Sequence, residues 1–218
     1  MVELRVKAGM STSLLRASDF YARLCEQIEE DEKHLEWPQP HWDDARNHAI
    51  SAVVLATAAL EASINELFQQ AIDRDKNALS PLTESQLVLL EELWNEVEAF
   101  SILRKYQVAL SATGKRPLPK GEEPFQSTSS LIVLRNAIIH FKPEWDDELK
   151  LHQSLEKRLS RYFRPSELSA QAKGRMVWFP HKCLGAGCAR WATNTVIKFL
   201  EEFSHQMGIR DRVIKVSV

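Results

Sequence analysis

Long stretches of the chain contain neither glycine nor proline, and this constrains the fold more than any other feature of the sequence. Only seven of the 218 residues are glycine and nine are proline, and the ranges 41–80 and 82–113 contain neither. In such stretches the apolar residues recur every three or four positions, which is typical of an amphipathic helix and not of a strand. The pattern predicts an all-α protein.

The expected helices are separated by prolines, glycines and polar clusters. They run from about Thr12 to His34, Asp43 to Asp73, Thr83 to Leu110, the cluster 127–130 to just before Pro143, Asp146 to Leu159, and Cys188 to Met207. Thr83 and Gln86 have the spacing of a capping box, and the Ser/Thr cluster 127–130 offers further caps. Pro143 should end its helix, because a proline disfavours the helical conformation of the residue before it.

The two ends of the chain alternate apolar and polar residues, at 2–6 and at 214–218. This alternation fits a small strand pair formed by the termini, and it fits frayed ends equally well. No internal repeat or low-complexity segment is visible. The expected organisation is therefore a single helical domain over residues 1–218.

Composition indicates a soluble protein in a reducing compartment. Hydrophobic residues make up 44% and charged residues 27% of the chain, and the net charge of −2 argues against coating of nucleic acid through bulk charge. The three cysteines cannot all pair within one chain, and the charged N-terminus lacks the apolar core of a signal peptide. The longest apolar run, 49–60, is too short to span a bilayer. We expect a cytoplasmic protein with no membrane anchor.

The stretch "LIVLRNAIIHFKPEW" at 131–145 places polar residues within an apolar helical run. Asn136 and His140 are four residues apart and lie one above the other on a helix, while Arg135 lies about 100° around it with a side chain long enough to reach the same region. Burying such groups costs free energy unless they form hydrogen bonds or ion pairs, or take part in binding or catalysis. A histidine that can hold or release a proton beside a permanently charged guanidinium suits phosphoryl chemistry.

The segment "LRNAIIH" resembles the R-x-x-x-x-H signature of HEPN domains, including the polar residue after the arginine. The upstream run "ATAALEASINELF" is similar to the earlier long helix of HEPN-like proteins. The resemblance implies an all-α helical bundle that acts as a homodimer with two motifs facing each other. Many HEPN proteins are metal-independent endoribonucleases, often toxins or phage-defence effectors, and others have lost activity and serve as binding scaffolds.

Carried onto this chain, the resemblance makes Arg135, Asn136 and His140 the catalytic residues. His140 would move a proton at the ribose 2′-hydroxyl or the leaving 5′-oxygen, and Arg135 would stabilise charge on the phosphorane-like transition state. Asn136 would orient the histidine or a phosphate oxygen. The product would carry a 2′,3′-cyclic phosphate, and neither a metal nor another cofactor would be needed.

Three further residues are assigned roles around this motif. Some HEPN toxins carry a tyrosine two residues after the histidine, which a partner enzyme modifies; Lys142 stands there in this chain, so that form of silencing is excluded. Lys142 is instead a candidate RNA-phosphate contact. Trp145 is a candidate base-stacking residue, with packing in a core or interface as the other interpretation. Glu61 is either a solvated side chain or a salt-bridge partner that orients Arg135.

Other motifs are weaker. His181, Cys183 and Cys188 lie close together, but zinc sites need four ligands at recognisable spacings, and Gly185 and Gly187 more simply allow close packing at a helix start. No phosphate-binding loop, nucleophile elbow or dinucleotide fingerprint is present.

The expected partners are RNA, a second copy of the chain and a possible protein regulator. The alternatives are an inactive HEPN-like scaffold and an unrelated bundle in which Arg135 and His140 are structural.

Overall fold

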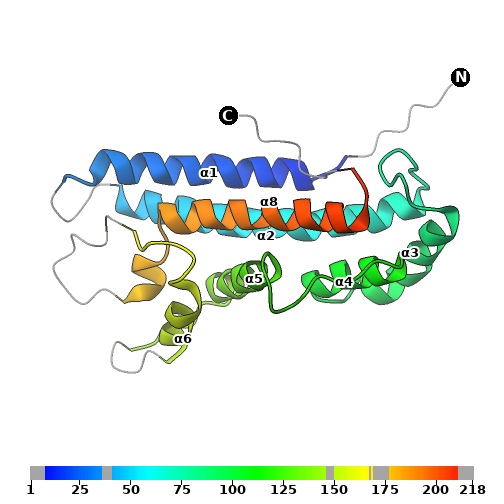
Figure 1. Ribbon diagram of the computed structural model, residues 1–218. Coiled ribbons are helices and arrows are strands. Elements are labelled where there is room, and N and C mark those ends of the chain that lie inside the picture. Colours follow the sequence, from blue (N-terminus) through cyan, green and yellow to red (C-terminus); the bar gives the residue numbers. More distant parts are fainter. Residues whose placement is uncertain (1–7, 36–40, 146–149, 167, 169–176, 211–218) are drawn as a thin grey trace, which may run out of the picture. The chain divides into compact units, whose positions relative to one another are not determined.

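The computed structural model describes residues 8–35, 41–145, 150–166, 168 and 177–210, and the regular structure in these parts is helical, without strands. The elements are α1 (Ser11–Glu32), α2 (Trp42–Ile72), α3 (Glu84–Val97), α4 (Ile102–Ala112), α5 (Phe125–Ile139), α6 (Lys150–Leu159), the short irregular turn η1 (Trp178–Lys182) and α8 (Ala186–Met207) (Figure 1). The prediction of an all-α chain is confirmed for the described residues.

The long helices match their predicted ranges closely. The apolar periods of α1, α2 and α8 locate their ends to within about two residues. The capping box at the start of α3 is also confirmed, since the Gln86 amide donates to Thr83 Oγ1 and the Thr83 amide donates to Gln86 Oε1. The proposed terminal strands at 2–6 and 214–218, and the cap at Asp146, lie outside the described residues.

The prediction of one continuous helix from Thr83 to Leu110 is wrong. The helix ends at Val97, and a new helix begins at Ile102 after an extended Ser101. No glycine or proline marks the break. The break lets α3 and α4 lie against each other, and Leu90 and Tyr106 are both buried, so that tertiary packing overrides local helix propensity here.

The helices form two compact units, which are described separately. The first comprises Met1–Leu14, Ala58–Leu118 and Leu200–Val218, and the second comprises Leu15–Thr57 and Pro119–Phe199. The helices α2 and α8 each contribute one part to each unit. Whether the chain is one folding domain stays a prediction.

The core of the first unit is aromatic and aliphatic. The hydroxyl of the buried Tyr106 donates to the Leu60 carbonyl at 2.7 Å, and its ring meets the edge of Phe203 with a centroid distance of 4.7 Å. Phe68 packs against Trp94 at 5.3 Å. These contacts bring α2, α3, α4 and the end of α8 around one apolar centre.

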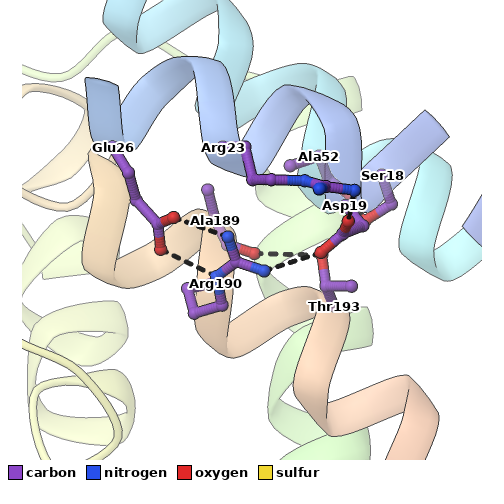
Figure 2. Close-up of polar contacts among 8 residues, drawn as sticks. All are labelled: Ser18, Asp19, Arg23, Glu26, Ala52, Ala189, Arg190 and Thr193. Atoms are coloured by element: carbon purple, nitrogen blue, oxygen red, sulfur yellow. Dashed lines mark hydrogen bonds and ion pairs between the residues drawn. The ribbon is translucent and has the colours of Figure 1, made fainter. Parts of the chain in front are cut away.

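The core of the second unit depends on small residues. Four alanines, spaced three or four apart on α2, are almost completely buried: Ala45, Ala49, Ala52 and Ala56. This narrow face lets neighbouring helices approach closely, and the hydroxyl of Ser18 on α1 donates to the Ala52 carbonyl at 2.9 Å. Figure 2 labels these two residues beside an ion-pair network that joins α1 to α8.

Among the described helices, α2 is long and apolar enough to cross a membrane by length and composition. A core helix of a soluble protein meets the same criterion, and half of the apolar window in α2 is buried within the protein. The buried Thr57 and Ser63 also lie on this helix. The property therefore does not distinguish a membrane helix from a core helix, and the cytoplasmic location stays a prediction.

Candidate functional site

The helix that carries the motif starts earlier than its Ser/Thr cluster. The residue before α5 is Pro124, and the cluster that was expected to cap the helix lies inside its first turns. The hydroxyls bond back to carbonyls of the preceding turn, Ser127 Oγ to Pro124 at 3.0 Å and Thr128 Oγ1 to Pro124 at 2.8 Å. The capping prediction for 127–130 is therefore wrong, because these hydroxyls find their partners within the helix.

The motif residues lie at the C-terminal end of α5. Its buried face carries Leu131 and Leu134, while Asn136 and His140 are exposed and Arg135 is half-buried. His140 is the C-cap residue, and its amide donates to the Asn136 carbonyl at 2.9 Å. Across the part of the chain that the structure describes, no hydrogen bond or ion pair involves the side chain of Asn136 or His140. Both side chains are therefore available to a ligand.

The predicted partner of Arg135 lies in the other compact unit. Glu61 is half-buried on α2, and its Oε1 lies 3.9 Å from Nζ of Lys105. Lys105 is 3% exposed and donates to Asn65 Oδ1 at 3.0 Å. Glu61 therefore has a cationic neighbour within its own unit, and its pairing with Arg135 stays a prediction.

Exposed apolar side chains follow the motif. Ile139 and Phe141 are about half exposed, and Trp145 is 80% exposed. The interpretation of Trp145 as a core residue of this chain is therefore wrong. Lys142 is exposed among them and has no polar partner within the described residues. The end of α5 thus combines an imidazole, an amide, an ammonium group and exposed aromatic rings.

A second histidine near the motif, His152, was not predicted from the sequence as a residue of this region. His152 on α6 is 4% exposed, and its ring stacks on Phe141 at 6.1 Å and meets the edge of Phe179 at 5.5 Å. Neither ring nitrogen makes a hydrogen bond, and Nε2 lies 3.8 Å from Glu144 Oε2. The spacing of His152, Leu155 and Leu159 along one helical face indicates its burial.

A third histidine, His181 on η1, has a pKa below its usual value. Burial disfavours its charged form, and Arg46 and His152 oppose a positive charge there while Asp43 favours it.

Among the described residues no group of three or more His, Cys, Asp or Glu side chains has the arrangement of a metal site. Close packing accounts for the neighbouring glycines, because a Cβ on Gly185 would lie 2.3 Å from Glu29 Oε1.

Comparison with protein-family models, curated proteins and solved structures finds no match for this chain.

Proposed function

We propose that the chain is a HEPN-like helical bundle that cleaves RNA without a metal ion, with Arg135, Asn136 and His140 as its catalytic residues. One observation carries the proposal: the Asn136 and His140 side chains are exposed together at the end of α5 and have no partner within the described residues. An exposed imidazole and amide with no partner of their own can reach the hydroxyl and phosphate oxygens of a substrate.

The surroundings of the motif suit a single-stranded RNA substrate. Lys142 offers an exposed ammonium group for a phosphate, and Trp145 offers an exposed ring for a base. Stacking of a base on such a ring contributes about 1–3 kcal/mol with little sequence preference. The chain's net charge of −2 means that RNA binding would depend on this local arrangement.

In the proposed reaction the ribose 2′-oxygen attacks the adjacent phosphorus. An imidazole of His140 accepts the 2′-hydroxyl proton, the bond from phosphorus to the 5′-oxygen breaks, and a protonated imidazole donates a proton to that oxygen. The guanidinium of Arg135 stabilises the negative charge on the phosphorane-like transition state. A homodimer supplies two copies of His140, one as base and one as acid. The products are a 2′,3′-cyclic phosphate and a 5′-hydroxyl, and no water is consumed.

A nuclease of this kind acts in the cytoplasm as a toxin or phage-defence effector. Because Lys142 stands where some HEPN toxins carry a modifiable tyrosine, control of this chain would use another route, such as a protein regulator.

The test is cleavage of mixed cellular RNA by the purified chain in EDTA. We expect cleavage that leaves cyclic-phosphate ends, and a rate at least ~100-fold lower for His140→Ala, since general acid–base catalysis contributes about 10²–10⁴-fold. The matched control is His205→Ala, which removes an exposed histidine near the end of α8 and should cleave at the unsubstituted rate.

Equal cleavage by the His140→Ala variant and the unsubstituted chain would remove His140 from the reaction. Absence of cleavage by a folded protein on every RNA tested would instead favour a HEPN-like binding scaffold, in which the motif has no catalytic use.

A further inference from the structure

The second compact unit contains a cavity of about 750 Å³ that the proposed nuclease reaction does not use. It is formed by four parts of the chain: Glu26 on α1, residues 123–127 at the start of α5, residues 161–164 after α6, and the first half of α8. Sites for small organic ligands typically have volumes of about 300–1,000 Å³. The cavity therefore has the size of a site for an organic ligand and not only for an ion.

The exposed motif residues Asn136 and His140 lie away from the cavity on α5. Ser127 lines the cavity, Asn136 follows nine residues later and His140 thirteen residues later. At about 100° and 1.5 Å per residue, Asn136 lies about 180° around the helix from Ser127, and His140 lies about 20 Å along it. A ligand in the cavity would not touch the exposed motif residues.

The charged side chains of the cavity are mostly cationic. Arg161, Arg164 and Lys198 are exposed along its wall, and Glu123 is the exposed carboxylate there. Within the described residues Arg164 and Lys198 have no ion-pair or side-chain hydrogen-bond partner, and Arg161 donates only to the Tyr162 hydroxyl. In a chain whose net charge is −2, this excess of unpaired cations favours an anion with more than one charge.

Arg190 also lines the cavity, but its charge is already balanced. It donates to Glu26 and to Asp19, as Figure 2 shows. Since Glu26 lies on the same wall, this ion pair adds little net charge to the cavity. Arg161, Arg164 and Lys198 are therefore the cations of the cavity that a bound anion can contact.

A pair of stacked aromatic rings lies beside these cations and forms one wall of the cavity. The rings of Tyr162 and Trp191 stack with a centroid distance of 5.2 Å and an angle of 20°, and the guanidinium carbon of Arg161 lies 4.7 Å from the Tyr162 centroid. Near them Asn194 is exposed, and Thr195 is 4% exposed with a hydroxyl that has no partner in the described part of the chain. An aromatic surface with free amide and hydroxyl groups suits the ring and sugar of a nucleotide.

The local sequence explains how Arg164 reaches the cavity. A Cβ on Gly187 would lie 2.8 Å from the Arg164 carbonyl oxygen, so only glycine lets this segment pass so close to α8. The approach holds residues 161–164 against the wall that Trp191 and Lys198 provide. The cationic and aromatic parts of the cavity are thus positioned by backbone packing.

We infer that this cavity binds a nucleoside diphosphate or triphosphate. The phosphates contact Arg161, Arg164 and Lys198, and the base lies against the wall formed by Tyr162 and Trp191. Inorganic phosphate would fill only a small part of the volume, and an RNA strand bound at His140 would lie about 20 Å along α5 from Ser127. The inference does not depend on RNA cleavage, and the site would be occupied whether or not the motif is catalytic.

The test is calorimetric titration of the full chain with ADP, GDP, CDP and UDP at low ionic strength, with and without Mg²⁺. At least one of them should bind, and its affinity should fall at least ~10-fold in Arg164→Glu and in Lys198→Glu, because a charge reversal replaces attraction with repulsion. Arg16→Glu is the matched control, since it reverses an exposed charge on α1 outside the cavity. Adenosine lacks the phosphates, and inorganic pyrophosphate lacks the base and the sugar. Each should therefore bind at least ~10-fold more weakly than the best nucleotide.

The inference would be overturned if none of the four nucleotides binds, or if Lys198→Glu and Arg16→Glu bind them equally. Binding of pyrophosphate as tight as that of every nucleotide would reduce the cavity to an anion site and would overturn the assignment of a base-binding wall. Loss of binding of a ten-nucleotide RNA in Lys198→Glu, without nucleotide binding, would make the cavity an RNA contact. Circular dichroism of each variant checks that a loss of binding is not a loss of folding.

Discussion

Arg190 on α8 holds both carboxylate oxygens of Glu26 on α1, with Nε to Oε1 at 2.7 Å and Nη2 to Oε2 at 2.5 Å (Figure 2). Its third nitrogen donates to Asp19 Oδ1 at 2.6 Å, and Arg23 pairs with the other oxygen of Asp19. A fork-shaped guanidinium matches a carboxylate in this way, whereas an ammonium group cannot. The pairing with Glu26 raises the pKa of Arg190 above its usual value.

The first prediction concerns this pair. Arg190→Ala should lower the free energy of unfolding by about 1–2 kcal/mol, because it leaves Asp19, which is largely buried, without one of its two cations. Arg190→Lys should recover only part of this loss, since lysine cannot form the two parallel bonds. Urea unfolding measures both, with Arg16→Ala as the control on the exposed face of α1. Equal stability of all these variants would show that the pair contributes nothing.

The second prediction concerns the close approach of α1 and α8. The Ser18 hydroxyl is completely buried, and it lies 2.7 Å from Thr193 Oγ1 and 2.9 Å from the Ala52 carbonyl. Ser18→Ala should lower the free energy of unfolding by about 1 kcal/mol, the usual net value of a buried hydrogen bond. Ser13→Ala, at an exposed position of the same helix, should change it by less than about 0.5 kcal/mol. A larger effect at Ser13 than at Ser18 would contradict this account of the helix contact.

The sequence predicts the long helices well, because each has an apolar seam and a proline or glycine near at least one end. It fails at the break between α3 and α4, where no such residue stands and tertiary packing decides. It also fails at the start of α5, since a Ser or Thr near a helix start can cap the helix or bond back within it, as Ser127 does. Composition and spacing do not distinguish these two uses.

The site is predictable in part. The motif spacing places Asn136 and His140 together on an exposed helix end, and the structure agrees on that placement. The spacing gives no sign of the cavity, because Arg164 and Lys198 are distant in sequence and meet only through the packing of α8. Likewise, Arg190 and Asp19 are 171 positions apart, and no local pattern pairs them. Such long-range pairings require the fold.

The third prediction concerns the cysteines, all of which are buried thiols. Burial raises the pKa of the Cys25 thiol, with the carboxylate of Glu29 as a further cause, and burial together with a hydrogen bond to Cys188 raises the pKa of Cys183. Since the thiolate is the reactive form, a thiol-specific disulfide reagent should not react with the folded chain at pH 8 within minutes. All three thiols should react after unfolding in urea. Fast stoichiometric reaction of the folded chain would mean that at least one of them is accessible.

The fourth prediction concerns pH. Burial, with Arg46 and His152 nearby, lowers the pKa of His181 in the folded state below the value of about 6.5 expected for the unfolded chain. Between these two values the unfolded state binds more protons, so the contribution of His181 to stability is complete above about pH 6.5 and is lost as the pH falls through the folded pKa. Urea unfolding at several pH values should show a shallower dependence for His181→Gln than for the unsubstituted chain. His205→Gln, an exposed control, should keep the original slope; equal slopes for both variants would exclude the effect.

The last prediction tests the RNA contacts that the proposed nuclease needs. Lys142→Glu should weaken the binding of a single-stranded RNA, and the ratio of its dissociation constant to that of the unsubstituted chain should shrink as salt is raised, because the contact is a charge on a phosphate. Trp145→Ala should cost about 1–3 kcal/mol of binding with little salt dependence, because stacking does not depend on ionic strength as charge does. Fluorescence anisotropy of a labelled ten-nucleotide RNA in EDTA, measured on the His140→Ala background to prevent cleavage, separates the two effects. Lys157→Glu is the control for a charge reversal on α6, and a salt-sensitive loss there equal to that of Lys142→Glu would point to general repulsion in place of a specific contact.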